Sequence, residues 1–487
     1  MTLQVSTKKN SSEPEPKLAR LDTLLYSTAT NHLLREILCD RVIGCMIGSA
    51  LGDTIGLYTE FLSGQKALET YPSGKFTLTG GPNGDGPTPF LLDLHRASKQ
   101  EGHWTDDTDH ALLLVLGWLN QHGAGDGDLP FPTQQDLANR LRVWVQQGLK
   151  PLDTMPMGLG RLVGSVVASK GFLEDPEQVA REYWVKTGKK IAPNGSLMRT
   201  HPLGVMGLWE DEEVVFCKAA ELSRVTHVDL RCVLGCVLGT GLVRGLLRGE
   251  VRSERDLDAI LGRGVKWVKR ECLKGDVEDD IDGEFDWEEL NRYIYFGGDD
   301  GVADLLGGLQ LDEPTSIGYV YKTLGSGVML LRMAMRKLAG KKGSLARSNL
   351  FEELITDLIM RGGDADTNAC FAGALLGAYL GYQALPDHWK HGLVHGEWLT
   401  GKAEAMCQVL GLKEGDYVGK EDKDTWPDAG KEMISQQEME VKWMLLQQKT
   451  GKRMGIAISK AEAAAKTRSK SGWTSRLPWQ AKDTAKS

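Results

Sequence analysis

The sequence predicts an all-α protein whose helices lie mostly between residues 33 and 415. Over long stretches, of which residues 134–250 are the clearest, apolar residues recur at helical spacing and few segments alternate as a β-strand does. Glycine makes up 58 of the 487 residues, and many of these glycines stand four apart within apolar stretches. On a helix this spacing forms a ridge along one face, where the backbone of a neighbouring helix can approach closely. The ridges comprise Gly44, Gly48, Gly52 and Gly56; Gly235 and Gly239; and Gly373, Gly377 and Gly381.

Composition places the chain among soluble globular proteins. The apolar fraction is 41% and the charged fraction 25%, and no apolar run reaches the ~20 residues that a membrane span needs. A net charge of −8 argues against nucleic-acid binding as the main function. The eight cysteines show neither a CxxC pattern nor a Cys/His metal spacing, so we expect reduced thiols. We therefore expect an intracellular monomer, in the cytoplasm or the nucleus, with no membrane span and no specific nucleic-acid partner.

Composition also separates three regions along the chain. Residues 1–32 are polar, lack the apolar segment of a secretory signal, and are predicted to form a disordered arm. Residues 33–415 are predicted to form one domain, with an insertion at about 250–314. The acidic stretch 275–285 within that insertion has almost no core residues, so we expect it to be mobile and dispensable for ligand binding. Residues 416–487 are predicted to continue as helix and to end in a basic, disordered tail.

Two clusters of carboxylates and hydroxyls each precede an apolar helical run. They are Trp104-Thr-Asp-Asp-Thr-Asp109 and Arg361-Gly-Gly-Asp-Ala-Asp-Thr-Asn368. Capping of the helix N-termini needs one oxygen per helix, and the clusters hold more carboxylates than that. Closely packed carboxylates repel one another unless a cation neutralises them, and oxygen ligands select Mg²⁺, Mn²⁺ or Ca²⁺ rather than zinc. The sequence therefore predicts a dinuclear divalent-cation site assembled from two parts, with helix capping as the alternative.

Further segments carry polar groups that could meet a ligand. Asp53 and Glu60 follow the first glycine ridge, although an acidic residue there is more often solvated. Asn194-Gly-Ser196 precedes an apolar turn, and it would either present backbone N–H groups to phosphate oxygens or act as an ordinary helix cap. His227 opens another glycine-ridged helix, where it would contact a ligand or take a structural place. The Gly- and Pro-rich connection over residues 70–103 is longer than most loops, which favours a functional loop or lid.

Six segments, taken in order along the chain, resemble the motifs of the ADP-ribosylglycohydrolase family. That family includes the dinitrogenase-reductase-activating glycohydrolase and the eukaryotic ADP-ribosyl-acceptor hydrolases. One motif alone is weak, whereas the order of all six over about residues 35–400 is specific. The segments are Gly44 through Asp53 to Glu60, Trp104 to Thr108, Asn194 to Arg199, Arg224 to His227, Gly318 to Thr323, and Gly362 to Asn368.

The resemblance implies a compact, orthogonal bundle of helices that forms one catalytic domain and holds two Mg²⁺ or Mn²⁺ ions. The implied metal ligands are Thr105, Asp106, Asp107, Asp364, Asp366 and Thr367. The implied catalytic residues are Glu60, Asp107 and Asp364. The implied substrate-binding residues are Asn194, Gly195, Ser196, Met198, Arg199, His227 and Tyr319.

The resemblance also implies an activity, which is hydrolysis of the glycosidic bond between ADP-ribose and a protein side chain or a small acceptor. The acceptor stays open among arginine, serine, poly(ADP-ribose) and O-acetyl-ADP-ribose. A binuclear metal phosphohydrolase would use similar paired carboxylates, and a catalytically inactive ADP-ribose-binding protein would share the fold. The products distinguish the two enzymes, because one releases ADP-ribose and the other releases AMP or phosphate.

Overall fold

The computed structural model describes residues 28–79, 86–123, 131–272, 286–295, 304–339, 347 and 349–471. Among these residues helices alternate with turns and no β-strand occurs, although isolated bridges pair Ser63 with Gly362 and Pro193 with Tyr319. The prediction of an all-α fold is confirmed. The predicted N-terminal arm through residue 27, the acidic stretch 275–285 and the tail beyond residue 471 lie outside the described residues.

The described residues fall into two compact units. The main unit contains the residues up to 87 together with residues 102–432, and the second contains residues 88–101 together with those from 433 onward. The longer helices of the main unit are α2 (Thr28–Gly56), α4 (Asp106–Asn120), α5 (Gln134–Gln147), α7 (Pro176–Lys186), α8 (Leu197–Met206), α9 (Glu212–Arg224), α10 (Leu230–Leu247), α11 (Glu254–Glu271), α13 (Val320–Leu338), α14 (Leu350–Ile359), α15 (Ala365–Leu380) and α17 (Gly396–Val409). Its shorter helices are α3 (Gly64–Thr70), α6 (Arg161–Ala168), α12 (Trp287–Ile294) and α16 (Asp387–Lys390), with 3-10 turns at η1 (Lys150–Leu152), η2 (Gly207–Trp209), η3 (Gly307–Leu309), η4 (Pro314–Ser316), η6 (Tyr382–Ala384) and η7 (Lys423–Thr425).

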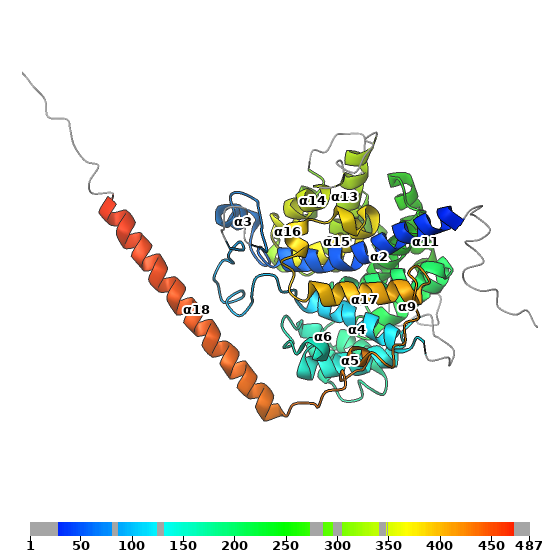
Figure 1. Ribbon diagram of the computed structural model, residues 1–487, viewed down its shortest axis with the longest axis horizontal. Helices are drawn as coiled ribbons and strands as arrows, with labels where there is room; N and C mark the ends of the chain where they lie inside the picture. The colour runs from blue at the N-terminus through cyan, green and yellow to red at the C-terminus, as the bar shows by residue number, and fades with distance from the viewer. Residues whose placement is uncertain are drawn as a thin grey trace, which may run out of the picture. The chain divides into compact units, whose positions relative to one another are not determined.

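Helices α2 and α15 pack backbone against backbone, and the predicted glycine ridges are the reason (Figure 1). A β-carbon added to Gly48 would lie 2.5 Å from the carbonyl oxygen of Gly373. One added to Gly377 would lie 1.9 Å from the carbonyl oxygen of Gly44. Because residue numbers rise along one helix as they fall along the other, the pair is antiparallel. The C-terminal end of α2 therefore lies beside the N-terminal end of α15.

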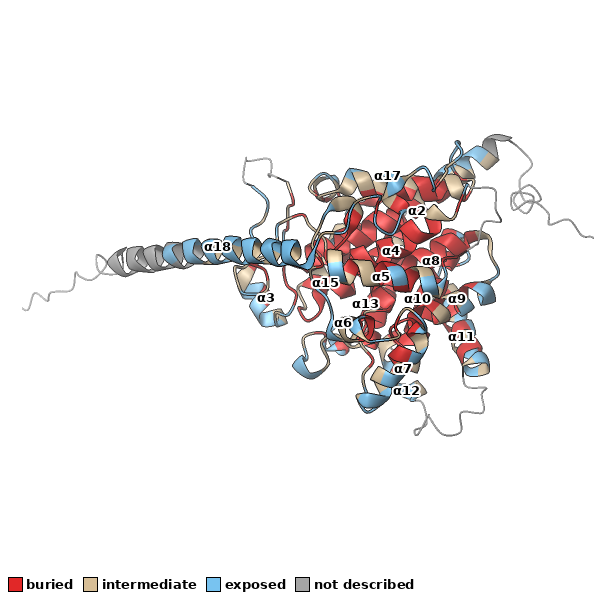
Figure 2. Ribbon diagram, turned by 90° about the horizontal axis from the view of Figure 1, so that it is seen from below, coloured by how far each residue is buried: buried red, intermediate tan, exposed pale blue. Residues whose placement is uncertain are grey.

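The glycines of α10 face side chains instead of a backbone. A β-carbon added to Gly235 would lie 3.0 Å from Val320 Cγ2, and one added to Gly239 would lie 2.8 Å from Phe371 Cε2. Among the described helices, α10 is long and apolar enough by length and composition to cross a membrane, but 89% of it is buried inside the protein (Figure 2). This burial is that of a core helix, and it gives no indication of a membrane span.

The described parts of the predicted 250–314 insertion form helices. Helix α11 begins with a capping box, in which the Ser253 side chain and the Asp256 side chain accept hydrogen bonds from each other's backbone. Helix α12 begins after Asp286, whose side chain accepts from the backbone N–H of Glu289 at 2.8 Å. Buried Leu290 and Ile294 attach α12 to the main unit. The insertion therefore contributes helices α11 and α12 to the main unit.

The second unit contains helix α18 (Gln436–Ser471) and the segment 88–101. Arg453 joins the two, because its Nη1 donates to the carbonyl oxygens of Ala97 and Lys99. Where its side chains are described, α18 is largely exposed (Figure 2), and Met444 and Ile456 are 59% and 58% exposed.

Candidate active site

Two groups of buried carboxylates share one aspartate. Asp53, Asp107 and Asp366 each offer an oxygen, and these oxygens lie within 4.8 Å of one another; Glu60, Asp364 and Asp366 do the same. We call these groups the first and the second triad. All five residues are buried, although they come from α2, the turn after it, α4 and the start of α15. The structure thus brings the two predicted clusters together, while the role of each carboxylate as a ligand stays a prediction.

The packing of α2 on α15 explains why the triads meet. A β-carbon added to Gly56 would lie 2.3 Å from Asp366 Cα, so the last turn of α2 lies against the first turn of α15. Asp53 sits one turn before Gly56. The glycine ridge therefore continues into the site and sets the separation between carboxylates of the two helices.

The turn that carries Glu60 is fastened to the loop before α15. Phe61 N donates to Gly363 O at 2.6 Å, and Gly363 N donates to Leu62 O at 2.9 Å. Gly362 and Gly363 have φ of 70° and 72°, in the left-handed region that favours glycine. A β-carbon on Gly363 would also lie 2.1 Å from the carbonyl oxygen of Leu311. This tight loop holds Glu60 and Asp364 in the same triad.

Asp53 was not among the implied metal ligands or catalytic residues, and the structure gives it a central place. Its carboxylate accepts hydrogen bonds from the backbone N–H and the hydroxyl of both Thr105 and Thr108, at 2.6–3.0 Å. Asp53 belongs to α2, and through these hydrogen bonds it caps the N-terminus of α4. This contact fixes the position of Asp107 in the first turn of α4. The Thr105 hydroxyl, predicted as a metal ligand, lies 2.9 Å from oxygens of both Asp53 and Asp107 and has one proton to donate.

The first triad contains a carboxylate oxygen without a hydrogen-bond partner among the described residues. This oxygen is the buried Asp107 Oδ1. Burial raises the pKa of Asp107 well above its ordinary value, and the charges of Asp53 and Asp106 raise it further. Burial likewise raises the pKa of Asp366, with Glu60 and Asp107 adding to the effect. Raised pKa values at both aspartates are what closely packed carboxylates produce in the absence of a cation.

The residues present fit divalent cations. All the available ligand atoms are carboxylate oxygens, and they form two groups that share Asp366. One of these oxygens, Asp107 Oδ1, has no hydrogen-bond partner among the described residues. Hard cations such as Mg²⁺ or Mn²⁺ prefer such a set. Helix capping does not account for the carboxylate of Asp364. Asp364 occupies the N-cap position of α15, but its side chain makes no capping hydrogen bond.

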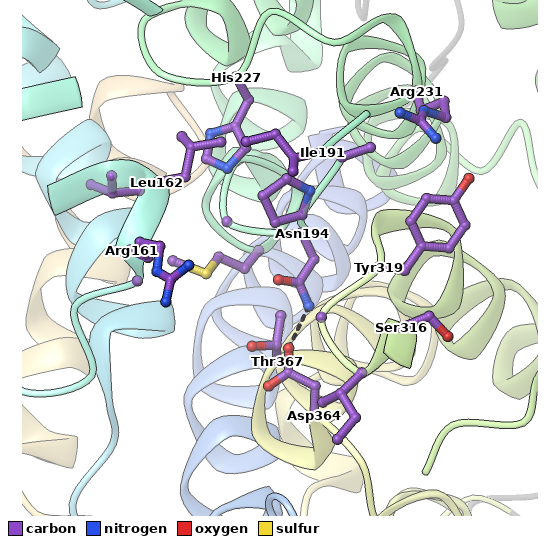
Figure 3. Close-up of a pocket in the computed structure, with 18 of the residues that line it drawn as sticks. Arg161, Leu162, Ile191, Asn194, His227, Arg231, Ser316, Tyr319, Asp364 and Thr367 are labelled. Atoms are coloured by element: carbon purple, nitrogen blue, oxygen red, sulfur yellow. Dashed lines mark hydrogen bonds between the residues drawn. The ribbon is translucent and has the colours of Figure 1, made fainter. Parts of the chain in front are cut away.

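A hydrogen-bond network orients Asp364. Asn194 Nδ2 donates to Asp364 Oδ2 at 2.8 Å and to Thr323 Oγ1 at 2.9 Å (Figure 3). Thr323 Oγ1 in turn donates to Asn368 Oδ1 at 2.7 Å. Asn194 N donates to Gly318 O at 3.0 Å, so this N–H of the predicted phosphate-binding turn is used within the protein. The structure therefore gives Asn194 a place beside a triad carboxylate, in addition to its place on the cavity wall.

The triads lie at the wall of a cavity of about 1120 Å³. Of the predicted residues, those that line it are Glu60, Asp106, Asp107, Asn194, Gly195, Met198, His227, Tyr319, Asp364, Asp366 and Thr367. Asp106 belongs to neither triad, and its carboxylate packs on Gly158, where an added β-carbon would lie 2.0 Å from Oδ1. Thr367 N donates to Asp366 Oδ1 at 2.9 Å.

Ser196 and Arg199 lie behind the wall instead of lining the cavity. Arg199 is fully buried, and its Nη2 donates to Thr226 Oγ1 at 2.8 Å and to Leu222 O at 3.2 Å. Thr226 Oγ1 also pairs with His227 Nδ1 at 2.7 Å. The Ser196 hydroxyl accepts from Ser223 Oγ at 3.1 Å. The structure thus places both residues where they support the cavity-lining His227 and the start of α8.

His227 faces the cavity across Gly195. A β-carbon added to Gly195 would lie 3.2 Å from both Cε1 and Nε2 of the imidazole. Burial lowers the pKa of His227 well below its ordinary value, and the nearby charge of Arg199 lowers it further, so the ring is neutral at physiological pH. Because Nδ1 pairs with Thr226, Nε2 is the nitrogen that can serve a ligand.

A comparison of the whole chain with known protein families identifies the family to which the chain belongs. Residues 34–416 match the family model described as ADP-ribosylglycohydrolase. The chain belongs to the ADP-ribosylglycohydrolase family. The resemblance read from the six ordered segments is therefore confirmed, and ADP-ribosylated molecules are the substrates that membership in this family implies.

Individual relatives of this ADP-ribosylglycohydrolase family member are distant. An uncharacterized protein of Archaeoglobus fulgidus is 24% identical over 375 residues, which cover 76% of this chain and 97% of the archaeal protein. An ADP-ribosylarginine hydrolase of Serratia proteamaculans is 22% identical over 367 residues, 75% of this chain and 79% of the relative. A solved structure described as an ADP-ribosylglycohydrolase-related protein complex aligns with a TM-score of 0.46 at 22% identity, covering 77% of this chain and 99% of its own.

Several residues of the cavity wall in this ADP-ribosylglycohydrolase family member are not among the predicted site residues. Arg161 and Lys190 line the cavity, both are exposed, and neither forms an ion pair with a described residue. Figure 3 shows Arg161 on the opposite side of the cavity from Tyr319 and Arg231. The available signal was Gly158-Leu-Gly160 directly before Arg161, a pattern typical of a turn that opens a helix. Glu289 and Tyr293 of α12 complete the missed set.

The raised pKa of Asp364 predicts how pH changes the stability of the metal-free protein. Burial and the charge of Glu60 raise its pKa from 3.8 to about 6. A carboxyl group whose pKa is higher in the folded than in the unfolded protein stabilises the fold at low pH. For Asp364 this stabilisation is roughly 3 kcal/mol below pH 4, and it is lost as the pH rises through 6. In EDTA, Asp364→Asn should therefore lose less Tm than wild type between pH 4.5 and pH 7.5. Equal losses in thermal scans of both proteins would contradict this assignment.

Proposed function

We propose that this protein is a divalent-cation-dependent hydrolase that cleaves the glycosidic bond between ADP-ribose and an acceptor. One observation carries the proposal: two buried carboxylate triads share Asp366 and open into a cavity large enough for a dinucleotide-sized ligand. Membership in the ADP-ribosylglycohydrolase family supports the same substrate class.

Asp53, Asp107 and Asp366 would hold one cation, and Glu60, Asp364 and Asp366 the other. Bound cations would orient the ribose hydroxyls and lower the pKa of a water molecule. Glu60 or Asp364 would accept the proton of the attacking water, since both carboxylates reach the cavity. Asn194 holds Asp364 in place through its Nδ2, so the geometry of that carboxylate is set before substrate enters.

Two cations among the cavity-lining residues suit the diphosphate. Arg161 and Lys190 supply positive charge that no described carboxylate neutralises. A diphosphate carries negative charge, and the carboxylate triads would repel it unless it lay toward these cations. Neutral His227 would offer Nε2 as a hydrogen-bond donor or acceptor without adding charge. The charge pattern therefore favours binding with the ribose at the triads and the diphosphate beside Arg161 or Lys190.

The proposal predicts a specific product. Incubation of the full chain and Mg²⁺ with arginine-linked and serine-linked ADP-ribosyl peptides should release free ADP-ribose from at least one of them, detected by chromatography. EDTA should abolish the release, and Mg²⁺ should restore it. Release of AMP or phosphate would instead identify a phosphohydrolase. Binding of ADP-ribose without turnover of any linkage, including poly(ADP-ribose) and O-acetyl-ADP-ribose, would identify an inactive binding protein.

A further inference from the structure

Helix α12 of the insertion forms part of the cavity wall, away from the carboxylate triads. Its residues Glu289 and Tyr293 line the cavity together with Tyr319 and Arg231. Figure 3 shows Tyr319 and Arg231 on one side of the cavity, with Arg161 on the other and Asp364 below. We call Glu289, Tyr293, Tyr319 and Arg231 the α12 wall. Glu289 and Tyr293 belong neither to the expected ADP-ribose-binding residues nor to the triads.

The side chains of the α12 wall hold one another in place. The Tyr319 hydroxyl donates to Glu289 Oε1 at 2.9 Å. The rings of Tyr293 and Tyr319 meet edge to face, with centroids 5.9 Å apart. The Arg231 guanidinium lies over the Tyr319 ring, 5.8 Å from its centroid. Glu289 Oε2 has no hydrogen-bond partner among the described residues, which leaves one carboxylate oxygen to accept from a ligand.

The negative charge of Glu289, beside Tyr293, disfavours the diphosphate as the ligand of this part of the wall. Arg231 is the only cation among the four wall residues, and Asp229 neutralises it through two hydrogen bonds, from Nε at 2.9 Å and from Nη2 at 2.8 Å. Glu289 would repel a phosphate. The ribose that is cleaved must lie at the triads, so it cannot occupy this wall at the same time. Two tyrosine rings beside a hydrogen-bond-accepting carboxylate suit a flat heteroaromatic ring that bears an amino group.

We propose that the α12 wall binds the base of ADP-ribose and that Glu289 determines which base is accepted. Glu289 Oε2 accepts a hydrogen bond from the exocyclic amine of adenine, and Tyr293 contacts the ring. A base with a carbonyl oxygen at that position would bring two acceptors together and bind more weakly. The inference rests on the proposed function, because it takes ADP-ribose as the ligand. It makes the insertion a specificity element of this chain.

The test compares two ligands that differ at one position of the base. ADP-ribose and inosine diphosphate ribose, which carries hypoxanthine in place of adenine, are titrated into the Mg²⁺-loaded full chain by calorimetry. Wild type should bind ADP-ribose at least about tenfold more tightly, as expected for a hydrogen bond to a charged group. Glu289→Gln should reduce this ratio to within about twofold, since the amide can donate to a carbonyl as well as accept from an amine.

Two further variants separate base recognition from general damage. Glu288→Gln changes the neighbouring exposed carboxylate, which does not line the cavity, and should keep the wild-type ratio. Tyr293→Ala should lower the affinity for both ligands by a similar factor, because contacts with the ring do not distinguish the exocyclic amine from a carbonyl oxygen. An unchanged ratio in Glu289→Gln, or unchanged affinities in Tyr293→Ala, would overturn the inference. Failure of wild type to bind ADP-ribose at all would overturn the proposed function and the inference with it, whereas binding without base preference overturns the inference alone.

Discussion

Asp366→Asn should remove most of the Mg²⁺-induced thermal stabilisation and lower turnover on the order of 100-fold or more. Asp366 is the carboxylate that both triads share, so the substitution takes one charged oxygen ligand from each proposed cation position. The side chain keeps its size, and the metal-free protein should be as stable as wild type or more so, because carboxylate repulsion is relieved. Thermal scans with and without Mg²⁺, together with ADP-ribose release, measure both effects.

A capping role for Asp366 would give a different result. Asparagine caps a helix about as well as aspartate, so the substitution would then change neither stabilisation nor turnover. Asp175→Asn is the matched control, because Asp175 caps α7 by accepting from Gln178 N at 3.0 Å and lies outside the cavity. Equal Mg²⁺ response in Asp366→Asn, Asp175→Asn and wild type would refute the two-cation interpretation.

Gly52→Ala should destabilise the protein by about 3 kcal/mol or more, and it should also weaken Mg²⁺ binding. A β-carbon at this position would lie 1.9 Å from the carbonyl oxygen of Ala369 and 2.4 Å from its carbonyl carbon. These are backbone atoms of α15, so they cannot move aside as a flexible side chain does. The two helices must separate, and the separation carries Asp53 away from Asp366. Urea unfolding in EDTA measures the first effect and cation titration the second.

Gly262→Ala provides the control of opposite sign. Gly262 lies within α11, and a β-carbon there would meet nothing within 4 Å. Alanine is favoured over glycine in a helix interior by about 1 kcal/mol, so this variant should be slightly more stable than wild type. If Gly52→Ala were stabilised to the same extent, the α2–α15 contact would not be as close as the structure places it.

The sequence was sufficient to predict the helical class and the faces that the ridges occupy, because both follow from spacing along one helix. It did not identify which ridge packs on which, since that choice depends on contacts between residues more than 300 positions apart. The ridges of α2 and α15 turned out to be partners, whereas Gly235 and Gly239 face side chains. Spacing alone does not distinguish these two uses of glycine.

The site shows the same limit. Asp107, Asp364 and Asp366 stood in dense clusters, so repulsion between carboxylates was evident before folding. Asp53 stood alone, and its role depends on the threonines of α4 that it meets only in the folded chain. Arg199 was grouped with the ligand-binding residues because the family resemblance covers Asn194 to Arg199, yet its side chain lies behind the cavity wall and donates to Thr226. Glu289 and Tyr293 lay in the predicted insertion at about 250–314, close to its acidic stretch 275–285, and no motif marked them.

The backbone contact between α2 and α15 also determines where this molecule can move. Along the glycine ridges the two helices meet through carbonyl oxygens and glycine Cα atoms, so at these positions no side-chain rotamer can change to let them move. They cannot slide or rock without steric overlap, so this pair forms a rigid base for Asp53 and Asp366. Any opening that admits or releases ligand must occur in the elements that meet the cavity through side chains, among them α6 and α12. The protein therefore divides into a fixed frame that carries the shared carboxylate and an adjustable rim that meets the ligand.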